Sequence, residues 1–132
     1  MAEAGAYRIF SPEHIKALVD LVCNDPLFLV KASQEDLTTQ YVIKMEGAPL
    51  SYRIAVEKGK LVKLDNEEDA PFVLSAPREI WEGIFTGTIN PLVAIGQGKV
   101  RLVKGQLMQL ARWFGSFNRM FELFKEIKIE RV

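Results

Sequence analysis

The stretch that decides the fold, WEGIFTGTINPLVAIGQGKVRLVKG, spans residues 81–105. Its first part has a helical pattern, because the apolar residues recur on one face of a 3.6-residue turn. Gly87 follows and supplies the left-handed residue with which many helices end. The pattern predicts a helix that starts after Ser75 and presents one apolar face.

The second part of the stretch contains a short helix and a strand. Asn90-Pro91 is a typical helix start, since asparagine caps free backbone N–H groups and proline fits the first turn. Gly96-Gln97-Gly98 ends that helix. Residues 99–104 then alternate between the two faces of a predicted strand, and Gly105 ends it.

Upstream of this stretch, the apolar residues first repeat as in a helix and then as in strands. Ser11-Pro12-Glu13 starts a predicted helix that runs to about Asn24. Asp25-Pro26 repeats this start signal, so residues 27–32 form either a second short helix or an extended segment. Predicted strands follow at 38–46, 50–57, 60–64 and 71–74. The first three of them make an antiparallel meander with one apolar face.

The last helical region, predicted from Gln106 to about Ile127, carries more apolar surface than a helix needs to cover a sheet. We expect it to bend or break near Gly115-Ser116, because glycine weakens a helix and serine can restart one. A core helix, a dimer interface and the wall of a cavity for an apolar ligand each explain the surplus. The surplus comes from Leu107, Met108, Leu110, Ala111, Trp113, Phe114, Phe117, Met120, Phe121, Leu123, Phe124 and Ile127.

Composition excludes several classes of protein. The chain has 132 residues, of which 48% are hydrophobic and 26% charged, with a formal net charge of zero. These values favour one globular domain over residues 1–132 and argue against a disordered or nucleic-acid-binding chain. No apolar run reaches the roughly 18 residues of a membrane span, and residues 1–7 lack a signal-peptide pattern. The single cysteine can form no internal disulfide, so we expect a cytoplasmic protein.

One histidine and one cysteine leave little material for catalysis or metal binding. His14 and Cys23 lie nine residues apart on the first predicted helix and should therefore point to opposite sides. We expect His14 on the surface and Cys23 in the core. The acidic cluster at 65–69 lacks the ligand spacing of a calcium loop and is expected to be a solvated loop. No catalytic residue, metal or cofactor is predicted.

Charge is distributed unevenly along the chain. Residues 1–98 carry 9 basic and 14 acidic side chains, whereas residues 99–132 carry 8 and 3. The asymmetry indicates either attraction between the two parts or a surface that contacts anionic headgroups. The basic residues considered for that surface are Lys99, Arg101, Lys104, Arg112 and Arg119.

The order of these elements resembles that of the sterol carrier protein type 2 lipid-binding domain over roughly residues 11–127. The most specific part is the segment from Thr86-Gly87 through Asn90-Pro91 to the strand between Gly98 and Gly105. The resemblance implies an α+β fold, with a five-stranded, mainly antiparallel sheet covered by helices. It also implies an apolar cavity between sheet and helices for sterols, fatty acids, fatty acyl-CoA or phospholipids, and no catalytic residues. The chain ends at 129–132 without a peroxisomal signal, which agrees with the cytoplasmic expectation.

Two functions follow from the residues and the resemblance. The first is noncatalytic binding or transfer of an apolar lipid, such as a fatty acid, fatty acyl-CoA, sterol or isoprenoid-like molecule. The second is an accessory or assembly role, with the aromatic helix docked on a lipid- or quinone-modifying enzyme. Transient contact with an anionic membrane and a homodimer are compatible with both, and a nucleic-acid partner is not expected. The predicted ligand-facing residues are Trp81, Ile84, Phe85, Ile95, Met108, Trp113, Phe114, Phe117 and Phe121.

Overall fold

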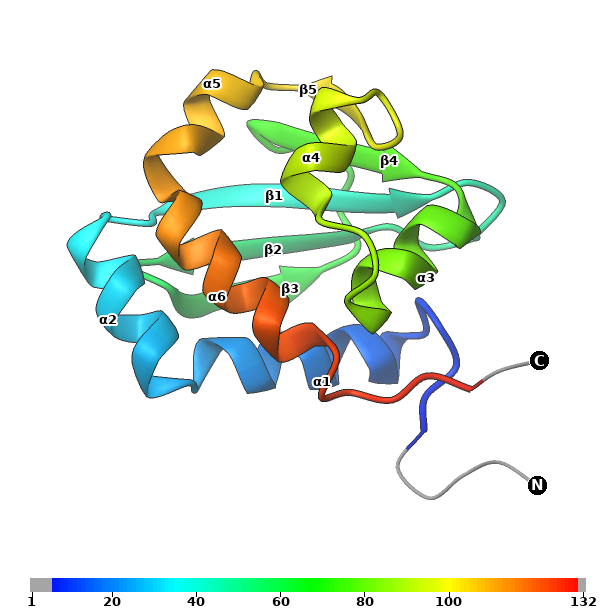
Figure 1. Cartoon of the computed structure of the whole chain (residues 1–132), viewed down its shortest axis with the longest axis horizontal. Coiled ribbons are helices and arrows are strands. Elements are labelled where there is room, and N and C mark those ends of the chain that lie inside the picture. Colours follow the sequence, from blue (N-terminus) through cyan, green and yellow to red (C-terminus); the bar gives the residue numbers. More distant parts are fainter. Residues whose placement is uncertain (1–5, 131–132) are drawn as a thin grey trace.

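The computed structural model describes residues 6–130, in which helices cover one face of a five-stranded sheet (Figure 1). The strands are β1 (Thr39–Met45), β2 (Tyr52–Glu57), β3 (Lys60–Asp65), β4 (Phe72–Ala76) and β5 (Arg101–Lys104). The helices are α1 (Pro12–Cys23), α2 (Pro26–Gln34), α3 (Arg78–Thr86), α4 (Pro91–Gly96), α5 (Leu107–Leu110) and α6 (Phe114–Phe124). A 3₁₀ turn (Ala111–Trp113) joins α5 to α6.

The sheet has the strand order β3-β2-β1-β4-β5. β1 runs parallel to β4, and the other neighbouring pairs are antiparallel. This confirms the predicted α+β fold with five mainly antiparallel strands, and the predicted meander corresponds to β1, β2 and β3. β1 occupies the centre of the sheet, so the alternate side chains on its covered face lie beneath the helices.

Three helices start as the sequence predicts. Ser11, Asp25 and Asn90 each precede a proline, and each side chain accepts a hydrogen bond from a backbone N–H two or three residues ahead. Residues 27–32 belong to a helix, not to an extended segment. The predicted start after Ser75 was wrong, because Ser75 continues β4 beside β1 and α3 begins only after Pro77.

The break in the last helical region lies slightly before the predicted place. α5 gives way to the 3₁₀ turn at Ala111, α6 restarts at Phe114, and the helix ends at Phe124, before Ile127. The Glu35 carboxylate explains the restart, because it accepts hydrogen bonds from Gly115 N at 3.1 Å, Ser116 N at 2.8 Å and Ser116 Oγ at 2.6 Å. The carboxylate thus caps the free N–H groups of α6 from the end of α2.

Gly115 leaves room for the carboxylate of this cap. A methyl group on Gly115 would lie 2.6 Å from Glu35 Oε2, so any larger residue would push the carboxylate away. A second link between the two helices joins Arg119 of α6 to Asp25, the N-cap of α2, with Nε to Oδ2 at 2.8 Å and Nη2 to Oδ1 at 2.9 Å. Both links hold α6 against α2 and thereby fix the position of its apolar stripe.

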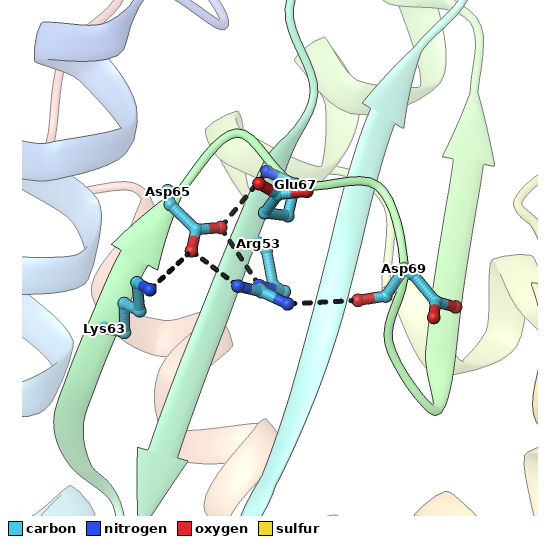
Figure 2. A network of polar contacts seen from close by, with 5 residues as sticks. All are labelled: Arg53, Lys63, Asp65, Glu67 and Asp69. Atoms are coloured by element: carbon cyan, nitrogen blue, oxygen red, sulfur yellow. Dashed lines mark hydrogen bonds and ion pairs between the residues drawn. The ribbon is translucent and has the colours of Figure 1, made fainter.

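The face of the sheet away from the helices is more polar. Arg53 on β2 binds Asp65 at the end of β3 through two contacts of 3.0 and 2.6 Å, and Lys63 lies 3.6 Å from the same carboxylate (Figure 2). The hydrogen bond from Arg53 holds the pKa of Asp65 below its usual value. Among the other acidic residues of this loop, Glu68 pairs with Lys44 and Asp69 with Lys104. The acidic cluster therefore neutralises basic side chains of the sheet.

His14 is fully buried, so its predicted surface position was wrong. Its Nδ1 accepts a hydrogen bond from Phe10 N at 3.0 Å, and its ring lies 4.8 Å from that of Phe85. Within residues 6–130 its Nε2 has no hydrogen-bond partner. Burial lowers the pKa of His14 to about 4. The sequence did not show that residues 7–10 would bring Phe10 N and the ring of Tyr7, 6.3 Å from that of His14, against the histidine.

Candidate functional site

An apolar cavity of about 130 Å³ lies between the sheet and the helices. Strands β1, β2 and β4 supply its floor, and helices α1, α3, α4, α5 and α6 supply its walls. The lining residues are Ile15, Leu18, Val19, Val22, Cys23, Thr39, Tyr41, Ile43, Ile54, Phe72, Leu74, Trp81, Ile84, Phe85, Pro91, Leu92, Ile95, Leu110, Phe117, Met120, Phe121 and Phe124.

The floor of the cavity follows from the period of the strands. Tyr41 at the centre of β1 is in register with Ile54 of β2 on one side and with Phe72 of β4 on the other. Since alternate residues of a strand point to one face, Thr39 and Ile43 join Tyr41 on the floor. The alternation that predicted the strands thus also selects the residues that face the cavity.

The walls follow from helical spacing. The apolar residues of α1 recur at intervals of three and four and form one face that points to the sheet. On α6 the wall consists of Phe117, Met120, Phe121 and Phe124, which are only partly buried. Pro91, Leu92 and Ile95 of α4 are partly exposed as well. These half-buried side chains of α4 and α6 form the rim of the cavity.

The cavity offers almost no polar chemistry. None of its lining residues is charged, and its polar side chains are Thr39, Tyr41, Cys23 and Trp81. The indole N–H of Trp81 is already used, since it donates a hydrogen bond to Lys44 O at 2.8 Å. Burial raises the pKa of the Cys23 thiol to about 11, which is the opposite of the lowered pKa that makes a cysteine nucleophilic. Among residues 6–130, no three His, Cys, Asp or Glu side chains gather as metal ligands.

The structure brings six of the predicted ligand-facing residues together and leaves three outside. Trp81, Ile84, Phe85, Ile95, Phe117 and Phe121 line the cavity, and ligand contact by these residues stays a prediction. Met108, Trp113 and Phe114 do not line it. Met108 is 82% exposed on α5 and Phe114 is 39% exposed at the start of α6. Trp113 is buried on the 3₁₀ turn, where its ring packs against Phe72 at 5.9 Å and Phe117 at 6.3 Å.

The three misplaced residues share one cause. The 3₁₀ turn changes the helical phase between α5 and α6, so a single stripe drawn along 106–127 cannot hold on both sides of the turn. The sequence analysis also did not select the cavity residues of α1 or those of the floor on β1, β2 and β4. The periodicity of α1 and the alternation of β1 and β2 were visible, but both patterns are equally typical of a filled core. Only the three-dimensional structure shows that the two apolar faces leave space between them.

Comparison with solved structures identifies the arrangement. The chain superimposes on the conserved hypothetical protein TT1886 from Thermus thermophilus with a TM-score of 0.81 at 16% identity, covering 95% of this chain and 93% of that one. A crystal structure of sterol carrier protein 2 gives a TM-score of 0.80 at 18% identity, covering 91% of this chain and 99% of that one. The chain has the fold of sterol carrier protein 2. The predicted resemblance is thereby confirmed for the fold.

A third similar structure is the UbiJ-SCP2 ubiquinone synthesis protein, with a TM-score of 0.58 at 14% identity, covering 82% of this chain and 87% of that one. No protein-family model and no curated protein matches the sequence. Within residues 6–130, no helix is both long and apolar enough to cross a membrane.

Proposed function

We propose that the protein binds an apolar lipid in the cavity between sheet and helices and carries it without changing it chemically. The observation that supports this proposal is the uncharged lining of the cavity, whose walls come from the helices that cover the sheet and whose floor is the centre of the sheet. Each methylene group that leaves water for such a lining contributes about 0.8 kcal/mol to binding. A lipid chain therefore needs no strong polar contact to bind there.

The size of the cavity sets a condition on this function. Its volume of about 130 Å³ is close to that of engineered cavities of about 150 Å³ that hold one benzene molecule. A long lipid chain therefore enters only if the walls move apart. The rim is suited to such a movement, because Met120 has a flexible side chain and α4 has only six residues. We expect α4 and the rim of α6 to separate when ligand binds.

The experiment that tests the proposal is native mass spectrometry of the purified protein, followed by organic extraction and identification of what it retained. A carrier retains a lipid in a defined ratio or takes up a fatty acid, sterol, acyl-CoA or quinone when offered one. If the protein is isolated empty and binds none of these below about 100 μM, a binding free energy weaker than about −5.5 kcal/mol, the carrier function is refuted.

A second candidate function rests on exposed apolar side chains. Val93 of α4, Val103 of β5 and Met108 of α5 are 54%, 54% and 82% exposed. The three elements that carry them lie along one edge of the molecule, the upper edge in Figure 1. Such side chains suit an accessory protein that docks on an enzyme, as the likeness to a ubiquinone synthesis protein also suggests. Val103→Glu combined with Met108→Glu would abolish docking and leave lipid binding in the cavity unchanged.

The same edge of the molecule carries basic side chains that suit contact with an anionic membrane during lipid transfer. Of the basic residues considered above, Lys104 and Arg119 are paired with Asp69 and Asp25. Lys99, Arg101 and Arg112 have no ion pair among the described residues and lie on or beside β5 and α5. We propose that these three residues attract the membrane. The lone Cys23 favours a reducing compartment such as the cytoplasm for this activity.

A further inference from the structure

The most informative group in the cavity is the hydroxyl of Tyr41. Tyr41 occupies the middle of the floor, between Ile54 and Phe72, on the central strand of the sheet. Its hydroxyl has no hydrogen-bond partner among residues 6–130, whereas the hydroxyl of Tyr52, the neighbouring tyrosine on β2, donates to Phe10 O at 2.8 Å. Tyr41 is only partly buried and borders the cavity. Because no protein group uses its hydroxyl, the hydroxyl is available to a molecule that enters the cavity.

The surroundings of this hydroxyl restrict the partner. Burial, with a smaller contribution from the nearby Cys23, raises the pKa of Tyr41 well above its usual value, so the hydroxyl keeps its proton and can donate it in a hydrogen bond. No charged residue lines the cavity, and therefore nothing there could compensate a buried carboxylate or phosphate. An uncharged oxygen acceptor satisfies the hydroxyl without that penalty.

We propose that the cavity selects an uncharged lipid with one oxygen function, a hydroxyl or a carbonyl, whose oxygen accepts a hydrogen bond from Tyr41 while its hydrocarbon part fills the apolar walls. This inference rests on the proposed lipid-binding function and narrows its ligand class. An ionised fatty acid then binds more weakly than the alcohol or ketone of equal chain length. It would have to leave its carboxylate in water at the rim and place its methyl end at Tyr41.

The test uses four ligands of one chain length: decane, decanol, 2-decanone and decanoate at a pH where the acid is ionised. Each competes with an uncharged fluorescent apolar probe for the purified full-length protein. We expect decanol and 2-decanone to bind about 3- to 10-fold more tightly than decane and decanoate. This is the factor in affinity that one hydrogen bond supplies. Tyr41→Phe should remove this advantage and leave the affinity for decane unchanged.

Two controls separate a role in ligand selection from a role in folding. Tyr41→Phe keeps the ring and deletes a hydroxyl without a partner, so the urea midpoint should not fall. Tyr52→Phe deletes a hydroxyl that is hydrogen-bonded to Phe10 O, so this variant should lose stability and still prefer decanol to decane. The ratio of the affinities for decanol and 2-decanone in the same assay shows whether the cavity prefers a hydroxyl or a carbonyl oxygen.

The outcomes distinguish this inference from the proposed function. If all four ligands bind equally and Tyr41→Phe changes nothing, the cavity is a lipid site but the selection by Tyr41 is refuted. If decanoate binds more tightly than decanol, the inference is refuted as well. If neither the apolar probe nor any of the four ligands binds to the protein, the proposed lipid-binding function is refuted.

Discussion

The buried histidine makes acid stability the most quantitative prediction of the structure. His14 is fully buried with a pKa of about 4, whereas the unfolded chain gives histidine its usual value of about 6.5. The folded protein therefore binds no proton at His14 until the pH approaches 4, while the unfolded chain is protonated below 6.5. The stability that neutral His14 provides is complete above pH 6.5 and is lost as the pH falls toward 4.

The size of this loss follows from the two pKa values. Linkage gives a decrease in the free energy of unfolding of about 1 kcal/mol by pH 5.5 and about 2–3 kcal/mol by pH 4.5, with a limit near 3 kcal/mol. Other groups also titrate in this range, and the lowered pKa values of Asp25 and Asp65 act in the same direction at lower pH. The contribution of His14 must therefore be obtained as a difference between two proteins.

His14→Asn supplies that difference. The asparagine oxygen can accept the hydrogen bond that Phe10 N donates to Nδ1, and asparagine does not titrate. Urea unfolding of both proteins across pH 4.5–7.5 measures the two free energies. We expect the variant to be less stable at pH 7.5, because a smaller side chain leaves a void, and the gap to shrink by about 2–3 kcal/mol at pH 4.5. A gap that is constant with pH would refute the reasoning.

Three further predictions concern the cap on α6, the cavity wall and the unpaired basic residues near β5. Glu35→Ala should lower the free energy of unfolding by about 2–3 kcal/mol in urea, and Glu35→Gln, which keeps one acceptor, by less; equal losses would contradict the cap. Phe121→Ala at the cavity should cost at most about half of the 3–5 kcal/mol expected for the tightly packed Phe28→Ala, and only the former should weaken lipid binding. Replacing Lys99, Arg101 and Arg112 by glutamine should abolish the salt-sensitive part of sedimentation with anionic vesicles. If vesicle binding of the unchanged protein does not depend on salt or lipid charge, these residues have no role in membrane contact.

Local signals in the sequence determine much of the fold. The Ser11, Asp25 and Asn90 caps, the alternation of β1 and β2, and the left-handed Gly87 (φ 86°) all act between near neighbours, and each was predicted from the sequence. The parallel pairing of β1 with β4 and the cap on α6 depend on residues far apart in the chain. Glu35 and Ser116 are 81 positions apart, so no local pattern could reveal their contact.

The candidate site was only partly predictable for the same reason. Periodicity identifies an apolar face but does not tell whether the opposite face fills it or leaves a cavity, which is why Ile54 could be mistaken for ordinary core although it lines the cavity. The 3₁₀ turn shifted the phase of Met108, Trp113 and Phe114. Tyr41 resembled any inward-facing strand residue, because a missing hydrogen-bond partner is a property of the folded structure alone.

The most direct test of lipid binding in the cavity is the detection of magnetisation transfer by NMR between a ¹³C-labelled decanol chain and the methyl groups of the protein. Binding in the cavity predicts transfer to Ile54 on the floor and to Ile84 and Ile95 on the walls, and none to the exposed Val62 of β3. Transfer confined to Val103 and Met108 would place the lipid on the outside of the molecule and contradict binding in the cavity.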